Sequence, residues 1–258
     1  MNDELASDAA QLKAYDRVIV HVFEQLRTQY GDADRLPFLK EQVEQAIADL
    51  GLVIRNPPDI PYTYRTGRSA LPDAILRHGH WAIDSDEGKG GYVFVRLERS
   101  PYFDIPEDLE AIPVLDATPQ IVLKYQESDE QALLARLRYN RLVDIFTSLT
   151  AYHLQSHFRT TVAGGQVEID DLYIGVNTEG QGFLIPIEAK TYRERLGVTQ
   201  IAQMTGFAAE HYPELPVIPV GVKVMQDDSF LFVEFTSERD LNKIASRRYK
   251  RYRLYREY

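Results

Sequence analysis

The sequence contains no cysteine among its 258 residues. This absence excludes disulfide bonds, zinc sites with thiolate ligands and a cysteine nucleophile, and it agrees with a reducing cytoplasm. The sequence also has no run of eighteen apolar residues, so we expect no membrane-spanning helix. The N-terminal stretch MNDELASDAAQLKAYDR is acidic and lacks the apolar region of a secretory signal, so we expect a cytoplasmic protein.

Basic residues are in short supply, since 29 Lys and Arg stand against 39 Asp and Glu, for a formal net charge of −10. A protein that binds nucleic acid needs a basic surface, and the chain as a whole lacks one. The last twelve residues, RRYKRYRLYREY, are the exception, because six of them are Lys or Arg and every third one from Tyr249 is tyrosine. This pattern suits phosphate contacts and base stacking, and it equally suits a helix whose tyrosines pack on a sheet.

Residues 1–105 combine helical periodicity with a hairpin pattern. Val18 and Leu26 belong to an apolar stripe, and a second helix is predicted over Phe38–Leu50, where Gly51 stops it. A short helix in LPDAILRHG precedes HWAIDSDEGKGGYVFVRL, in which two apolar runs flank a glycine-rich turn. Helices followed by a hairpin outline a winged-helix-like α+β domain. Some modules of this kind bind DNA, and others bind proteins.

Residues 106–125 are rich in proline and carboxylates, which predicts an irregular connection. In residues 126–258, Ser128 and Gln131 form a candidate capping box for a helix that extends to about His157. Three strands, a helix from about Thr199, further strands and a last helix are then expected. The order helix, three strands, helix, strand predicts an α/β fold with a mixed sheet and helices packed on it.

Two of these strands, QVEIDDLYIGV and FLIPIEAK, carry charged residues within apolar runs. Side chains alternate along a strand, so Glu188 and Lys190 share one face, whereas Asp170 and Asp171 point to opposite faces. Two carboxylates on neighbouring strands repel each other unless a cation lies between them, and Mg²⁺ suits such a site. A lysine beside the metal would orient or deprotonate an attacking water molecule.

The EID motif, followed by a turn and IEAK, resembles the PD-(D/E)XK nuclease superfamily, over roughly residues 126–235 and with its αβββαβ core. The resemblance implies that Asp170 and Glu188 bind Mg²⁺, that Ala189 contributes its carbonyl oxygen and that Lys190 is the catalytic lysine. Accessory candidates are Glu168, Asp171, His157, Arg159, Gln200 and Gln203, the glutamines because related nucleases place one near the active site. Candidate DNA contacts are Arg65, Arg68, Lys89, Arg247, Arg248, Lys250 and Arg251.

Several alternatives stay open. A structural salt bridge would also explain Glu188 and Lys190, and E-x-K recurs at Glu87 in a glycine-rich turn, as chance allows. Pro186 removes a backbone donor from its strand and suggests an edge or a bulge. His153 and His157 are four residues apart, so a helix would place both on one side as metal ligands or, more blandly, one of them in the core.

The resemblance implies a Mg²⁺-dependent DNA endonuclease, with Mn²⁺ as a substitute, that leaves 5′-phosphate and 3′-hydroxyl ends. We expect double-stranded DNA as the substrate and a restriction enzyme acting as a twofold homodimer. The alternatives are a repair or structure-specific nuclease and a DNA-binding regulator on an inert nuclease-like scaffold. We expect no nucleotide cofactor, because the GKGG stretch leads into a strand and no helix follows it.

Overall fold

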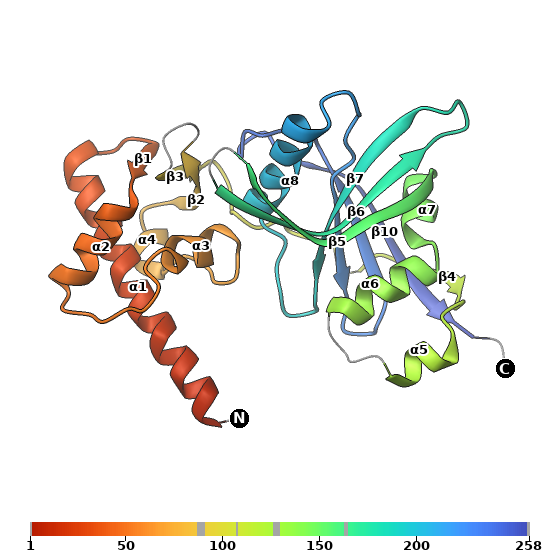
Figure 1. Ribbon diagram of the computed structural model, residues 1–258, viewed down its shortest axis with the longest axis horizontal. Coiled ribbons are helices and arrows are strands. Elements are labelled where there is room, and N and C mark those ends of the chain that lie inside the picture. Colours follow the sequence, from red (N-terminus) through yellow and green to blue (C-terminus); the bar gives the residue numbers. More distant parts are fainter. Residues whose placement is uncertain (1, 87–90, 107, 126–129, 163–164, 257–258) are drawn as a thin grey trace. The chain divides into compact units, whose positions relative to one another are not determined.

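The computed structural model describes residues 2–86, 91–106, 108–125, 130–162 and 165–256 (Figure 1). The chain divides into two compact units, with the boundary between Pro101 and Tyr102. Among the described helices, none is both long and apolar enough to cross a membrane.

The first unit consists of helices and one three-stranded antiparallel sheet, with the strand order β1-β3-β2. Its elements are α1 (Asn2–Tyr30), β1 (Arg35–Phe38), α2 (Lys40–Asp49), α3 (Asp59–Arg65), α4 (Asp73–Leu76), β2 (His80–Asp86) and β3 (Gly91–Leu97). The predicted hairpin is confirmed, since β2 pairs with β3. The helix predicted over Phe38–Leu50 is present but begins at Lys40, because Phe38 belongs to β1. Gly51 follows this helix with a φ of 63°, which an L-residue with a side chain rarely adopts. The glycine-rich hairpin tip, with Glu87 and Lys89, lies outside the described residues.

The core of the first unit forms where the apolar stripe of α1 meets the sheet. Val18, Val22 and Leu26 are buried on α1, as their four-residue spacing predicts. Phe23 of the same helix packs its ring edge against Trp81 of β2 and Phe94 of β3, with centroids 5.2 and 5.1 Å apart. These contacts hold the hairpin against α1.

The second unit is built on a seven-stranded mixed sheet with the order β4-β10-β9-β8-β7-β6-β5. Its strands are β4 (Ala111–Leu115), β5 (Thr150–Val162), β6 (Gly165–Val176), β7 (Gly182–Lys190), β8 (Val220–Val224), β9 (Phe230–Phe235) and β10 (Ser246–Tyr255). Its helices are α5 (Gln120–Tyr125), α6 (Glu130–Tyr139), α7 (Leu142–Thr147) and α8 (Val198–His211). The pairs β7–β8 and β4–β10 are parallel, and β6–β7, β8–β9 and β9–β10 are antiparallel.

Helices cover both faces of this sheet. Figure 1 shows α6 and α7 on one face and α8 on the other. Ile185, Ile187 and Ala189 of β7 belong to the apolar cluster under α6 and α7. From α6 to β8 the chain therefore follows the predicted order of helix, three strands, helix and strand, with one helical segment divided into α6 and α7.

Three predictions about the second unit are wrong. The helix expected to extend to His157 ends at Thr147, because Arg141 and Ser148 adopt left-handed backbone conformations with φ of 51° and 59°. The connection expected over 106–125 contains α5 and β4, which pairs with β10. The basic C-terminal run is the strand β10, which pairs with β9 and β4 on its two sides, so it is no helix. The capping box at Ser128 lies outside the described residues.

Candidate functional site

The candidate site lies on the face of the sheet that α8 covers, where β6 and β7 separate. Backbone pairing between these strands is continuous from Val176 with Gly182 to Asp171 with Ile187. One residue further, the carboxylate of Asp170 accepts a hydrogen bond of 2.7 Å from the backbone N–H of Ala189. A side-chain hydrogen bond thus replaces backbone pairing at this point, and this bond holds the Asp170 carboxylate beside the E-x-K segment.

Glu188 and Lys190 contact each other on this face, as the alternation along the strand predicted. The ammonium nitrogen of Lys190 lies 2.5 Å from Oε1 of Glu188, and Glu188 is 4% exposed while Asp170 is 9% exposed. Burial alone would lower the pKa of Lys190, but the charges of Glu188 and Asp170 outweigh it and raise that pKa above its ordinary value. Lys190 is therefore held as a cation between two nearly buried carboxylates.

Helix α8 adds two amide side chains to this face. The side-chain amide of Gln200 donates to the same Oε1 of Glu188, and its oxygen accepts a 3.2 Å bond from the N–H of Gly197. Gln203 lies three residues further along the helix, on the same side, and is also buried. Its Nε2 has no hydrogen-bond partner among the described residues. A buried amide left without a partner costs free energy, which is typical of groups that serve a ligand.

The residues of this site offer hard oxygen donors that suit Mg²⁺. The hydrogen bonds from Lys190 and Gln200 both reach Oε1 of Glu188, and the Asp170 carboxylate lies beside the backbone of Ala189. The described residues contain no group of three or more His, Asp or Glu arranged to hold a metal. The set inferred from the sequence has two carboxylates and one backbone carbonyl, so any metal here would keep several water ligands.

The sequence suggested that Pro186 lies in an edge strand or at a bulge, and the edge strand is wrong because β7 lies between β8 and β6. Pro186 pairs with Leu172 of β6, and the parallel pairing of β7 with β8 begins only at Ile187. Before that point β7 is joined to the segment preceding β8 through Leu184 instead. The missing N–H of proline is tolerated because this stretch of β7 has no regular partner on its β8 side.

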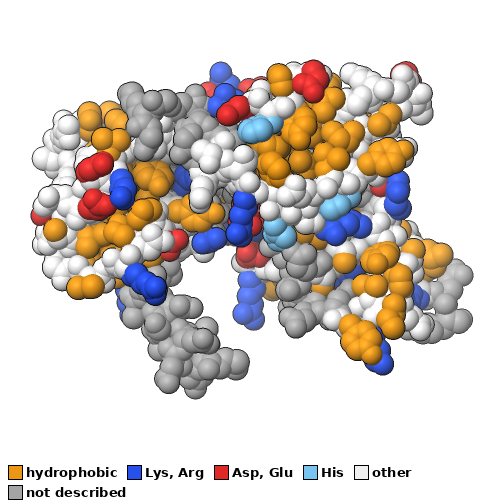
Figure 2. All heavy atoms as spheres, viewed as in Figure 1, with side chains coloured by type: hydrophobic (Ala, Val, Ile, Leu, Met, Phe, Trp, Pro, Cys, Tyr) orange, Lys and Arg blue, Asp and Glu red, His pale blue; other side chains and the backbone are white. Residues whose placement is uncertain are grey.

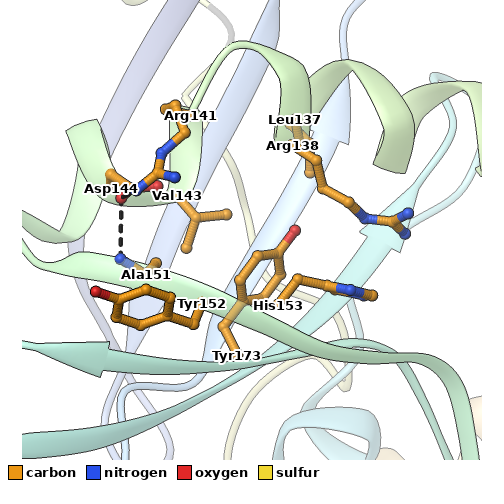
Figure 3. Close-up of a pocket in the computed structure, with 9 residues that line it drawn as sticks. All are labelled: Leu137, Arg138, Arg141, Val143, Asp144, Ala151, Tyr152, His153 and Tyr173. Carbon is orange, nitrogen blue, oxygen red and sulfur yellow. Dashed lines mark hydrogen bonds and ion pairs between the residues drawn. The ribbon is translucent and has the colours of Figure 1, made fainter.

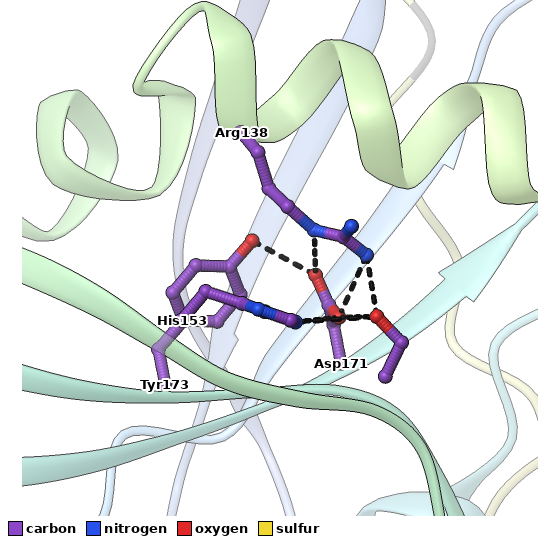
Figure 4. Close-up of polar contacts among 5 residues, drawn as sticks. Arg138, His153, Asp171 and Tyr173 are labelled. Atoms are coloured by element: carbon purple, nitrogen blue, oxygen red, sulfur yellow. Dashed lines mark hydrogen bonds and ion pairs between the residues drawn. The ribbon is translucent and has the colours of Figure 1, made fainter.

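Asp171 points to the opposite face of the sheet, toward α6 (Figure 4). It is fully buried, and its carboxylate accepts bonds from Nε and Nη2 of Arg138 at 3.2 and 3.1 Å. Tyr173, Ser156 and His153 contact the same carboxylate at 2.8, 2.7 and 2.8 Å. Burial disfavours the charge of Arg138, but Asp171 outweighs this effect and raises the pKa of the guanidinium. The accessory candidate Asp171 is therefore on the other side of the sheet from Glu188.

The cluster around Asp171 contains a serine, a histidine and an aspartate, but their geometry differs from a nucleophilic triad. Nε2 of His153 is the atom nearest both Asp171 and the hydroxyl of Ser156, at 2.8 and 3.2 Å. In a triad the two imidazole nitrogens face different partners, so that a proton can pass from serine to histidine. Here the Ser156 hydroxyl bonds to Asp171 directly, which makes the cluster a clamp between β5, β6 and α6.

The remaining accessory candidates form a separate surface group. His153 and His157 lie on the strand β5, so the helical metal pair is wrong. Arg159 donates to Glu168 across 3.0 Å, and Nδ1 of His157 lies 3.6 Å from the same carboxylate oxygen. His157 has a φ of 47°, which indicates an irregularity in β5 at this point.

The predicted DNA contacts in the first unit differ in exposure. Arg65 is only 2% exposed and donates to Ser85 across 3.0 Å, and burial lowers its pKa. A buried side chain cannot contact DNA, so this assignment is wrong. Arg68 stays exposed, with its guanidinium 4.8 Å from the ring centroid of Tyr62.

The basic run in β10 is largely neutralised by carboxylates. Arg248 pairs with Glu234 at 2.7 Å and lies over the ring of Phe146, while Arg251 pairs with Asp227 at 2.9 Å. Arg247 is 4.0 Å from Glu234, and Lys250 is exposed. On the one side of the second unit that Figure 2 shows, the described Lys and Arg side chains are scattered. Ion pairing within the sheet is thus the main role that the structure gives these arginines.

Sequence reasoning missed Arg138, Ser156 and Tyr173, the partners of Asp171. The only signal for them was the doubled aspartate, because a second carboxylate in an apolar run requires buried donors. Comparisons with protein-family models, with curated proteins and with solved structures found no match to this chain. No relative therefore assigns a role to any of these residues.

Proposed function

We propose that this protein is a Mg²⁺-dependent endonuclease that hydrolyses phosphodiester bonds in DNA. One observation carries the proposal: Asp170, Glu188, Lys190, Gln200 and the unpartnered Gln203 gather on one face of the sheet. A structural salt bridge would need only Glu188 and Lys190. The second buried carboxylate and the unsatisfied amide add free energy costs that a ligand would offset.

In this proposal Asp170, Glu188 and the carbonyl of Ala189 hold Mg²⁺ or Mn²⁺. A bound metal neutralises phosphate oxygens and lowers the pKa of bound water. Lys190, kept protonated by its carboxylate neighbours, donates hydrogen bonds to the attacking water or to a phosphate oxygen. Gln200 orients Glu188, and Gln203 supplies an amide donor for the substrate.

Double-stranded DNA is the proposed substrate, and a restriction enzyme acting as a homodimer is the proposed biological form. The order of helices and hairpin in the first unit, together with the exposed Arg68, supports a role in DNA recognition. A repair or structure-specific nuclease would use the same site on another substrate. Discrete fragments from a long natural DNA would favour restriction, and cleavage only at junctions or lesions would favour repair.

The test measures cleavage of supercoiled plasmid by the full chain in Mg²⁺, in Mn²⁺ and in a chelator. Asp170→Asn, Glu188→Gln and Lys190→Met should each lose at least about 100-fold in rate, since each removes a ligand or the charge at the reacting phosphate. Glu214→Gln is the matched control, because it removes an exposed carboxylate of the same unit.

Calorimetric titration with Mn²⁺ gives a second readout that needs no substrate. The wild type and Lys190→Met should bind the metal, whereas Asp170→Asn and Glu188→Gln should not. If the protein binds DNA but neither binds metal nor cleaves DNA, the result would instead support the alternative of a DNA-binding regulator. Near wild-type cleavage by Glu188→Gln or Lys190→Met would refute the site.

A further inference from the structure

A cavity of about 240 Å³ lies between helices α6 and α7 and the strand β5 (Figure 3). It is on the face of the sheet opposite Asp170 and Glu188, so the proposed nuclease chemistry does not use it. Figure 3 shows Arg138 and Arg141 entering from the helical side and Tyr152, His153 and Tyr173 from the strands. The wall is completed by Leu137, Val143, Asp144 and Ala151.

The polar groups of this wall leave mainly donors for a ligand. The carboxylate of Asp144 already accepts the N–H of Ala151 at 2.9 Å and a bond from Arg141. A guanidinium carries five N–H donors, of which Arg138 uses three on Asp171 and Ser156 and Arg141 uses one on Asp144. A ligand that fits these walls therefore needs acceptors for the remaining guanidinium N–H groups, and a negatively charged acceptor makes the strongest bonds with them.

Arg141 stands at a position where the backbone favours glycine. Its φ of 51° lies in the left-handed region, which costs a residue with a side chain about 1 kcal/mol. In its ion pair with Asp144 the Arg141 side chain is 58% accessible and that of Asp144 19%, and pairs with a solvent-exposed partner stabilise a fold little. A strained arginine that contributes little to folding is typical of a binding residue.

The size and the apolar part of the cavity limit the ligand further. A dry cavity of about 150 Å³ is enough to hold benzene, so 240 Å³ accommodates one ring or short chain together with one phosphate or carboxylate. Leu137, Val143 and Ala151 provide the apolar contact for the uncharged part. We propose that this cavity binds a small organic anion, with Arg141 and Arg138 holding its charged group.

The Asp171 cluster makes this site rigid. Asp171 fixes three wall residues at once, because it contacts Arg138, His153 and Tyr173. Side chains that are held in place before binding lose less conformational freedom when a ligand arrives. Asp171 is thus a positioning residue for the cavity, and Arg141 is the residue whose removal tests the site without disturbing the cluster.

Titration calorimetry of the full chain at low ionic strength, without metal, provides the test, with phenyl phosphate as the probe. We expect saturable binding of one probe per chain. Phenol lacks the charge and inorganic phosphate lacks the ring, so each should bind at least about 10-fold more weakly, which corresponds to about 1.4 kcal/mol.

Arg141→Gly should weaken binding of phenyl phosphate at least about 10-fold while the melting temperature stays the same or rises, since glycine suits this backbone. Tyr152→Ala provides a second wall variant and should also weaken binding. Arg239→Ala, which removes an exposed arginine elsewhere in the unit, should bind like the wild type. Equal affinity of wild type and Arg141→Gly, or no saturable binding up to about 10 mM, would overturn the proposal. Either result leaves the nuclease assay unaffected.

Discussion

Asp170 and Asp171 are neighbours in sequence, yet their substitution should have opposite consequences. Asp171 is fully buried and ion-paired with Arg138, whose side chain is 32% exposed. Breaking a buried pair costs about 3–5 kcal/mol, and partial exposure of Arg138 reduces the loss. In Asp171→Asn the amide oxygen also remains as a hydrogen-bond acceptor for some of these donors. We therefore expect Asp171→Asn to lower the free energy of unfolding by about 2–4 kcal/mol.

Asp170→Asn should change the free energy of unfolding by less than about 1 kcal/mol, because the amide oxygen still accepts the N–H of Ala189. It also removes one of two carboxylates that share this face. The same substitution should abolish cleavage. Both variants replace an aspartate with asparagine, at neighbouring positions, so each is the control of the other.

Scanning calorimetry and urea unfolding without metal provide the measurement. At about 2–4 °C per kcal/mol for a unit of this size, a loss of about 3 kcal/mol lowers the melting temperature by about 6–12 °C. The double variant Arg138→Met with Asp171→Asn should recover part of the loss, since no buried charge is then left unpaired. If Asp171→Asn stayed within about 0.5 kcal/mol of wild type, the clamp would have no energetic role.

Three further outcomes follow from burial and from the strand order of the sheet. Gln203→Leu should raise the free energy of unfolding of the second unit by about 1 kcal/mol, because it removes an unsatisfied amide, and it should also slow cleavage. Unfolding and plasmid assays measure the two effects. Unchanged cleavage would contradict the proposed donor role of Gln203. Arg65→Ala should destabilise the first unit by about 1–3 kcal/mol, whereas Arg68→Ala should not, because the Arg68 side chain is exposed. Thermal unfolding measures both variants, and equal effects would contradict the burial of Arg65. A chain that stops after Ala245 should lose the cooperative unfolding of the second unit, since it lacks the strand between β9 and β4, and a retained calorimetric transition would refute this.

The sequence was sufficient where a feature depends on local periodicity. Glu188 and Lys190 share a face because side chains alternate along any strand, and α8 was placed by its apolar pattern and by Pro213 beyond its end. The choice between Asp170 and Asp171 was not local. It depends on which helix covers which face of the sheet, and the contact of Asp171 with Arg138 of α6 becomes visible only in the structure.

The errors arose where the neighbouring element is distant in sequence. No glycine or proline marks the ends of α6 and α7, because Arg141 and Ser148 take the left-handed conformations themselves. The tyrosines of β10 recur every third residue, a spacing that matches neither a strand nor a helix closely. Pairing with β9 and β4 decides that this run is a strand, and these partners lie elsewhere in the chain.

The pairing of β4 with β10 has a consequence for the order in which the protein is made. About 130 residues separate Leu115 from Ser246, so at about 5–20 residues per second β4 waits about 7–26 seconds on the ribosome before its partner exists. During this time Ile112 and Leu115, which stay partly exposed even in the finished sheet, are open to other nascent chains. Pro113 lies between them and removes one backbone donor. This proline makes the waiting strand a poor template for association with the wrong partner.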